Sequence, residues 1–312
     1  MIPLIILGGL VLLGTPGWAS GLSKRGHPAN WVRQGLVLQL TGFALVEAGL
    51  LLWATPALLE LMGAADLALI CRRMLGGWLP SGRLSNAGAG LLAIAVVWLA
   101  ARGSWRVMAA QRRLRVERWL GAHHHREDFD LVVVPTGELV AYTVAGRPPQ
   151  VVLSRGLLQA VDSEDLEAIT AHEAVHVRRQ HYRFLLAISA VEAAFGWYRP
   201  AARGSQLIRF MLERWADEEA AVTSSTGRDG LRRVLVTVAM TPVATELTGF
   251  GAVDTITERA QALSRPASRS SCAGSAATYI AVSLGAVLAA GWLAWATWMS
   301  ILAVANPGLC VV

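Results

Sequence analysis

His172-Glu173-Ala174-Val175-His176 is the stretch that decides what kind of domain this chain contains. In a helix, positions four apart lie one above the other, so the two histidines can bind the same ion. Glu173 lies beside them, within reach of a water molecule at that ion. The pattern HExxH therefore predicts a zinc site with its own general base. The alternative is a helix with two surface histidines that bind nothing.

Two histidines do not suffice for a catalytic zinc ion, which needs a third protein ligand and one position open to water. The best candidate is Glu213, in the stretch Glu213-Arg214-Trp215-Ala216-Asp217 on a separate predicted helix. Asp217 is one turn further on the same face, where its carboxylate can accept the N–H of a zinc-bound imidazole. Glu218 and Glu219 are rivals, but neither has an acidic partner four residues on. A solvated acidic face is the alternative for this run of charges.

The composition indicates that this domain works at a membrane. Of the 312 residues, 54% are hydrophobic and 16% are charged. The mean hydropathy of +0.44 is too high for an ordinary soluble enzyme. Since a membrane crossing needs about 20 mostly apolar residues, we expect four transmembrane helices. They lie near residues 2–20, 35–59, 84–103 and 276–303.

Positive charges predict the orientation of these crossings. They gather between the first and second crossings, after the third, and before the fourth. The residues are Lys24, Arg25, Arg33, Arg102, Arg106, Arg112, Arg113, Arg115, Arg118, Arg259, Arg265 and Arg269. By the positive-inside rule these places are cytoplasmic and both termini lie outside, although the arginines of loop 60–83 weakly oppose this. The net charge of +6 thus indicates topology and anionic lipid headgroups as partners, and we expect no direct binding of nucleic acid.

The expected fold is a mainly α membrane protein with an inserted α+β cytoplasmic domain. Residues 1–118 would hold three crossings and a basic segment, 119–270 the metal-binding domain, and 271–312 the last crossing. Within the domain, β-branched runs predict short strands. An acidic first turn after Asp162 predicts a helix that runs through the HExxH to about Phe184.

Further elements follow from the same patterns. The predicted strands are 130–135, 139–144 and 150–154, and a short helix or turn follows at 154–160. We expect a buried helix at 184–198, in preference to a re-entrant membrane segment, and then a helix at about 205–223. The strand 150–154 could offer a free edge on which a substrate peptide aligns, or it could be internal to the sheet.

HEAVH followed by ERWAD resembles the HExxH…ExxxD signature of integral-membrane gluzincins. The layout of three crossings, a cytoplasmic HExxH domain and a fourth crossing is similar to the sensor-transducer peptidases of the BlaR/MecR type. Residues 141–146 and 151–158 are similar to the segment that precedes the metal helix in that family. Those antibiotic sensors carry an extracellular penicillin-binding domain after the last crossing. This sequence ends at Val312, so we expect no direct β-lactam sensing through such a domain.

The resemblance implies a gluzincin-like metalloprotease that cleaves a cytoplasmic regulator, often a transcriptional repressor. Its Zn²⁺ would be held by His172, His176 and Glu213, with Glu173 as base and Asp217 behind one histidine. Two alternatives stay open. One is HtpX-like quality control of membrane proteins, and the other is a non-catalytic scaffold that kept the fold.

Some polar residues have no assigned role at this stage. The oxyanion donor could be Tyr142, Tyr182, Tyr198, His181 or a neighbouring arginine. For His123-His124-His125, we expect a solvated linker in preference to a metal site. Glu47 would lie within the second crossing, where an ionisable group either serves a function or bonds to a neighbouring helix.

Overall fold

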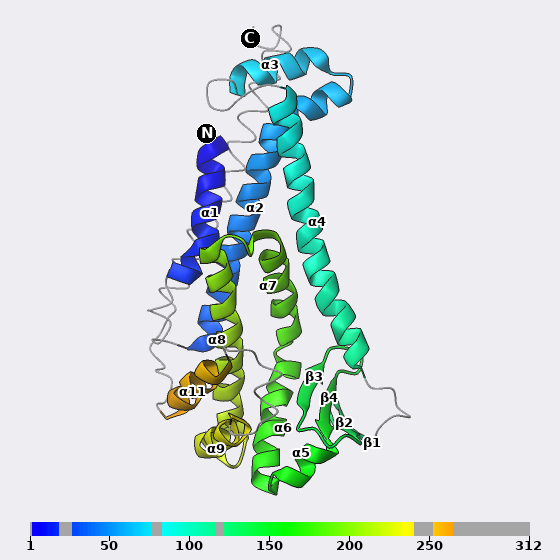
Figure 1. Cartoon of the computed structure of the whole chain (residues 1–312), viewed down its shortest axis with the longest axis vertical. Coiled ribbons are helices and arrows are strands. Elements are labelled where there is room, and N and C mark those ends of the chain that lie inside the picture. Colours follow the sequence, from blue (N-terminus) through cyan, green and yellow to red (C-terminus); the bar gives the residue numbers. More distant parts are fainter. Residues whose placement is uncertain (1, 19–26, 76–82, 116–121, 240–251, 265–312) are drawn as a thin grey trace, which may run out of the picture.

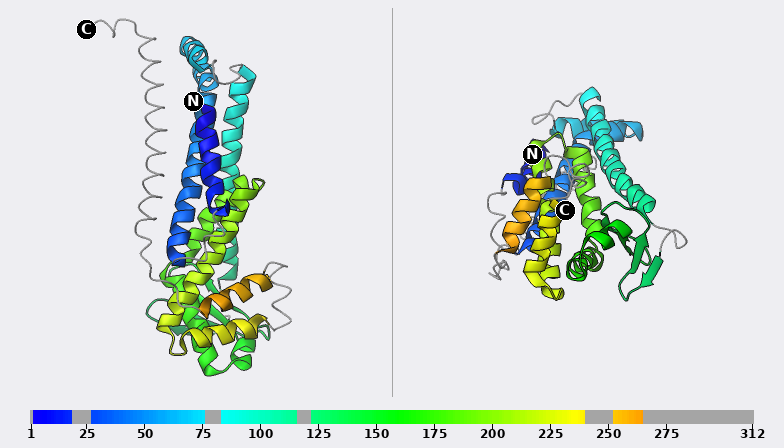
Figure 2. Two further views of the ribbon diagram at one scale, coloured as in Figure 1. Left: turned by 90° about the vertical axis from the view of Figure 1, so that its left-hand side faces the viewer. Right: turned by 60° about the horizontal axis from the view of Figure 1, so that its bottom comes forward.

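The computed structural model describes residues 2–18, 27–75, 83–115, 122–239 and 252–264 (Figure 1). Three long apolar helices run side by side along the long axis: α1 (Ile2–Trp18), α2 (Pro28–Leu61) and α4 (Arg83–Leu114). A small sheet and shorter helices gather at one end of this bundle (Figure 2). The short helix α3 (Ala65–Leu75) lies at the opposite end, where Arg72 pairs with Glu60 at the end of α2.

Two of the four expected crossings are supported by length and composition. Helix α2 and residues 84–114 of α4 are each long enough to span a membrane, and the most apolar stretch of 18 residues in each has a mean hydropathy of 1.8. Helix α1 is also apolar, but its 17 residues give about 26 Å, slightly less than a bilayer core. The fourth expected crossing, 276–303, lies outside the described residues. Glu47 is buried on α2, with 9% of its surface exposed.

Glycines bring α1 and α2 into backbone contact. A Cβ atom added to Gly9 would lie 2.7 Å from the carbonyl oxygen of Gly42, and one added to Gly42 would lie 2.5 Å from that of Gly9. Neither position can therefore hold a side chain without moving a helix. Small residues at such crossings allow apolar helices to pack closely within a membrane.

The sheet has the strand order β1-β2-β4-β3. Its strands are β1 (Ala122–His125), β2 (Asp130–Val134), β3 (Ala141–Val144) and β4 (Gln150–Ser154). The central strands β2 and β4 are parallel, while β1 pairs with β2 and β3 pairs with β4 in antiparallel fashion. The three predicted strands are confirmed, with ends that differ by at most two residues.

One prediction about the sheet is wrong, and one open alternative is decided. The segment 123–125, expected as a solvated linker, belongs to strand β1, where His125 Nδ1 lies 2.9 Å from Asp130 Oδ1 on β2. Of the two alternatives for β4, a free edge or an internal strand, the structure has the internal one, and all five of its residues are buried. Its unbroken apolar run Val-Val-Leu is typical of a strand covered on both faces.

The metal helix begins where the sequence predicts and ends earlier. Helix α5 (Arg155–Ala160) precedes α6 (Ser163–Arg178), whose first turn is capped by Asp162: its Oδ1 accepts the N–H of Asp165 over 2.8 Å. The predicted continuation to Phe184 is wrong, because Gln180 adopts a left-handed conformation with φ of 53°. This break turns the chain into a new helix, α7 (His181–Phe195).

Helix α7 leads into α8 (Arg199–Thr223), which starts six residues before the predicted Ser205. Pro200 lies in the first turn of α8, a position that needs no N–H donor, so it begins the helix instead of preceding it. As expected of a buried helix, α7 packs against α2, α4 and α8. Its residues Val191 and Phe195 share a core with Val46 of α2 and Val96 of α4. The helices that carry the site are thus packed directly on the apolar bundle.

Two more helices complete the described fold, α9 (Gly227–Ala239) and α11 (Ala252–Leu263). They pack against each other and against α8. A second core lies between α6, β4 and these helices, and it includes Val175, Leu153, Ala216, Leu231 and Leu263. This core fixes α6 against α8, which is the packing on which the site depends.

Candidate metal centre

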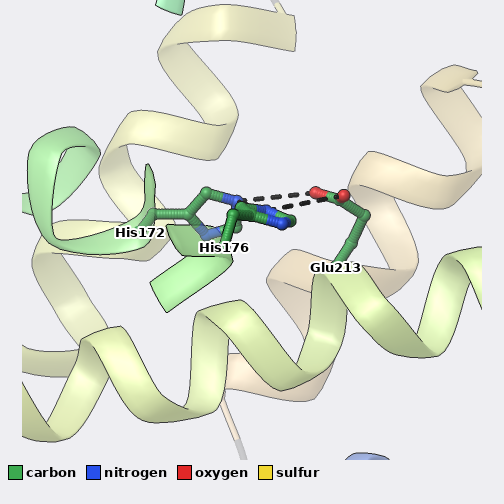
Figure 3. A group of neighbouring side chains, drawn as sticks. All are labelled: His172, His176 and Glu213. Atoms are coloured by element: carbon green, nitrogen blue, oxygen red, sulfur yellow. Dashed lines mark hydrogen bonds and ion pairs between the residues drawn. The ribbon is translucent and has the colours of Figure 1, made fainter. Parts of the chain in front are cut away.

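Side chains from α6 and α8 converge on one point between the two helices. His172 and His176 come from consecutive turns of α6, and Glu213 faces them from α8 (Figure 3). The two Nε2 atoms lie 3.2 Å apart. Glu213 Oε2 lies 3.5 Å from His172 Nε2, and its Oε1 lies 3.7 Å from His176 Nε2. All three predicted ligands are therefore in one cluster, with one ligand atom from each within 4.8 Å of the others.

The donor set of this cluster fits zinc. Two imidazole nitrogens and one carboxylate oxygen are the ligands of many catalytic zinc sites, which leave one further position for water or substrate. In the described part of the chain, no other group of histidine, cysteine and acidic side chains meets the same spacing. His124 and His125 are exposed on β1 and belong to no such group. Glu218 and Glu219, the rival third ligands, pair instead with Arg228 and Arg179.

Asp217 lies behind the first histidine, as predicted. Its Oδ1 is 3.0 Å from His172 Nδ1, and 3% of its side chain is exposed. Burial lowers the pKa of His172, but the hydrogen bonds to Asp217 and Glu213 outweigh burial and raise the pKa to about 10. Burial also works against the charged form of Asp217, but the guanidinium of Arg259 and the bond to His172 hold its pKa below the usual value. The contact fixes which nitrogen of His172 faces Glu213.

His181 lies behind the second histidine, a role that the sequence did not predict. Its Nδ1 is 2.9 Å from Nδ1 of His176, and only 1% of the residue is exposed. Burial lowers the pKa of His181 to about 3, so the ring is neutral. The ring packs on Trp215 of α8, with centroids 4.9 Å apart. Sequence reasoning missed this contact because a continuous helix to Phe184 would have directed His181 elsewhere.

Glu173 is held by strand β3. The hydroxyl of Thr143 donates to Glu173 Oε2 over 2.7 Å and lies 3.2 Å from the carbonyl oxygen of the same residue. Both residues line a cleft of about 540 Å³ between β3, α6, α7 and the end of α4. The predicted general base thus faces the space in which a substrate can bind, next to the three candidate ligands.

The cleft separates the candidate oxyanion donors. Tyr142, Tyr182 and His181 line it, as do three exposed arginines, Arg147, Arg178 and Arg183. Tyr198 does not line this cleft; its hydroxyl lies near Gly14 of α1, and its ring packs with the bundle core. Tyr142 donates to the carbonyl oxygen of Leu114 over 3.3 Å. Its pKa is raised by burial, so its phenol is a neutral donor near pH 7.

Arg259 is the second residue that sequence reasoning missed. It was counted among the charges that precede the fourth crossing, but its side chain is only 14% exposed and binds two residues of the site. Its Nε and Nη2 donate to Asp217 over 2.8 and 2.7 Å, and its Nη1 lies 3.2 Å from Glu213 Oε2. Burial lowers the pKa of Arg259, but these two carboxylates outweigh burial and hold the pKa above its usual value. The guanidinium is therefore charged. No short-range pattern connects residues so far apart in the chain.

Comparison with protein-family models gives one match. The model described as Peptidase family M48 matches residues 109–270, just over half of the chain. The matched range begins near the end of α4 and includes the sheet, α6, α8 and α11. No curated protein and no solved structure matches the chain.

Proposed function

The chain belongs to peptidase family M48, and we propose that it is a membrane-bound zinc endopeptidase whose active site is the cluster of His172, His176 and Glu213. One observation carries this proposal. The predicted base, Glu173, lines the same cleft as His176 and Glu213, so the metal ligands and a proton acceptor share one space. A scaffold that had lost turnover would have no need of both.

The chemistry that zinc supplies when bound is Lewis acidity, which polarises the scissile carbonyl and makes water a better nucleophile. Glu173 takes the proton of the attacking water at a carboxylate oxygen and then delivers it to the leaving amine. Thr143 holds Glu173 Oε2 by a hydrogen bond, so Glu173 keeps one orientation through both transfers. Tyr142, Tyr182, His181 or a cleft arginine would donate to the oxyanion.

Strand β3, not β4, is suited to align the substrate. It lies at an edge of the described sheet, and its residues Ala141, Tyr142 and Thr143 line the cleft. An extended peptide could therefore add to β3 by main-chain hydrogen bonds, directly above Glu173. Beyond β3 the edge is occupied by the end of α4. Gln111 Oε1 accepts the N–H of Ala145 over 2.8 Å, so a peptide would not pair with that N–H.

The substrate we propose is a cytoplasmic regulatory protein, such as a repressor, cleaved in response to a signal in the manner of the BlaR/MecR type. The domain would face the cytoplasm, and both chain termini would lie outside. The cleft lies beside the end of α4, beyond Arg102 and Arg106, and so close to the predicted inner surface of the membrane. This position also suits HtpX-like cleavage of damaged membrane proteins, which is the alternative.

The experiment that tests this proposal compares newly formed protein N-termini in cells that express the wild-type chain or Glu173→Gln. Glu164→Gln is the matched control, since Glu164 lies on the same helix but is exposed and pairs with Arg233 at the surface. We expect termini that require Glu173 and persist in the control. A few such termini support regulatory cleavage, and many clients support quality control. Identical profiles under several stresses would contradict a peptidase function.

A further inference from the structure

Arg259 binds two carboxylates of the metal centre from a helix outside it. Its fork donates two hydrogen bonds to Asp217, and Nη1 contacts Glu213 Oε2 at 3.2 Å. Arg259 does not line the substrate cleft. Its contacts are with one candidate metal ligand, Glu213, and with Asp217, which in turn contacts the ligand His172.

The two carboxylates need a cation between them. Glu213 and Asp217 are one turn apart on α8, where like charges repel each other. Both contact His172 of the opposite helix, and Glu213 also faces His176. A planar guanidinium can bind both carboxylates at once in fixed directions, whereas a lysine would provide only a point charge. Among the described residues, Arg259 is the arginine that contacts both.

We propose that Arg259 is a positioning residue of the metal centre. Its contact with Oε2 sets the rotamer in which Glu213 faces the histidines. Its two hydrogen bonds to Asp217 fix the direction of the carboxylate that orients His172. The inference rests on the proposed function, because it assumes that the cluster binds zinc. It also makes α11 part of the metal centre, through a residue that follows Asp217 by 42 positions.

A purely structural role would be to attach α11 to α8. The helix already has an apolar anchor for this purpose, since Ile256, Ala260 and Leu263 pack against the core between α6, α8 and α9. An ion pair that served only as an attachment would affect the stability of the fold and leave the metal affinity of folded molecules unchanged. The two roles therefore predict different results.

The test uses the full chain in detergent and measures zinc affinity by competition with a chromophoric chelator. Arg259→Lys and Arg259→Gln are compared with Arg228→Lys and Arg228→Gln. Arg228 on α9 pairs with Glu218, the residue next to Asp217 on α8, and Glu218 is not one of the three candidate ligands. A second measurement, the visible absorption spectrum of the cobalt-substituted protein, reports the geometry of the ligands, and thermal unfolding reports the fold.

We expect zinc to bind about 10–100-fold more weakly to Arg259→Gln, as for other losses of partners behind metal ligands. Arg259→Lys should lose less affinity but give a changed cobalt spectrum, and the Arg228 variants should match the wild type. If Arg259→Gln does not fold, Arg259→Lys decides by the same two measurements. Wild-type affinity and an unchanged cobalt spectrum in both Arg259 variants, or in the folded Lys variant alone, would overturn the inference. If the wild type binds zinc and cleaves nothing, only the proposed function fails.

Discussion

Thr143 on β3 donates a hydrogen bond to Glu173 on α6 over 2.7 Å, and this contact joins the strand that we propose to bind substrate to the proposed base. The position of Glu173 over the cleft therefore depends on the sheet as well as on its own helix. A peptide that adds to β3 would lie next to the carboxylate that must take the proton.

The contact predicts the effect of Thr143→Val, which keeps the shape of the side chain but removes its hydroxyl. We expect kcat for a peptide substrate to fall about tenfold, a fraction of what a general base contributes in total. Zinc content and KM should stay near those of the wild type. Thr143→Ser is the control, since it keeps the hydroxyl and should keep most of the activity. Equal kcat for the valine and serine variants would show that the hydroxyl does not position Glu173.

A second prediction concerns His181, whose Nδ1 lies 2.9 Å from that of His176. His181→Phe keeps a ring against Trp215 and removes the nitrogen that contacts His176. Zinc affinity should fall about 10–100-fold because the orientation of His176 is no longer fixed. His125→Phe is the matched control, since the side chain of His125 is 80% exposed on β1. Wild-type affinity in His181→Phe, measured by chelator competition, would argue against this role.

A third prediction uses two adjacent glycines of α1. A Cβ atom at Gly9 would lie 2.7 Å from the carbonyl oxygen of Gly42, whereas one at Gly8 would have nothing within 4 Å. Gly9→Val should therefore destabilise the protein by about 1–3 kcal/mol, as overpacking does, and Gly8→Val should have little effect. Thermal unfolding in detergent measures both. Equal melting temperatures for the two variants would mean that α1 and α2 are not in backbone contact.

Zinc binding should release protons near neutral pH. The pKa of His172 is raised to about 10 by Asp217 and Glu213, so the metal-free chain holds a proton there that zinc must displace. Protonated His172 contributes to the free energy of unfolding of the metal-free chain. This contribution is fully present below about pH 6.5 and is lost as the pH rises through about 10. Calorimetry at pH 7.5 in buffers of different ionisation enthalpy should show about one proton released. Asp217→Asn should reduce this number, and a binding heat that is independent of the buffer would contradict the prediction.

The sequence predicts the ligand cluster well because its information is local. The spacing of His172 and His176, and that of Glu213 and Asp217, follows from the helix repeat, and the packing of α6 on α8 then brings the pairs together. Strands β2, β3 and β4 were predicted from apolar runs, but β1 and the strand order were not, since pairing depends on contacts between distant residues. For that reason the sequence left open whether β4 is an edge or an internal strand, and the structure shows it to be internal.

The residues that sequence reasoning missed all take their roles from contacts between different helices or strands. Gln180 adopts a positive φ, which no propensity rule predicts for glutamine, and this turn brings His181 onto His176. Arg259 reaches Asp217 from 42 residues away, through the packing of α11. Thr143 meets Glu173 because β3 lies against α6. In each case a tertiary contact, not a motif, determines the role.

The proposed activity is zinc-dependent cleavage of peptide bonds, with the metal held by His172, His176 and Glu213 and with Glu173 as the base. Its most direct test is cleavage of an unfolded protein substrate by the purified full chain, before and after zinc removal, with the wild type and Glu173→Gln side by side. The wild type should lose activity with the chelator and regain it with zinc, and the variant should bind as much zinc but cleave at least about 100-fold more slowly. Cleavage by the wild type without zinc, or undiminished cleavage by Glu173→Gln, would contradict the claim.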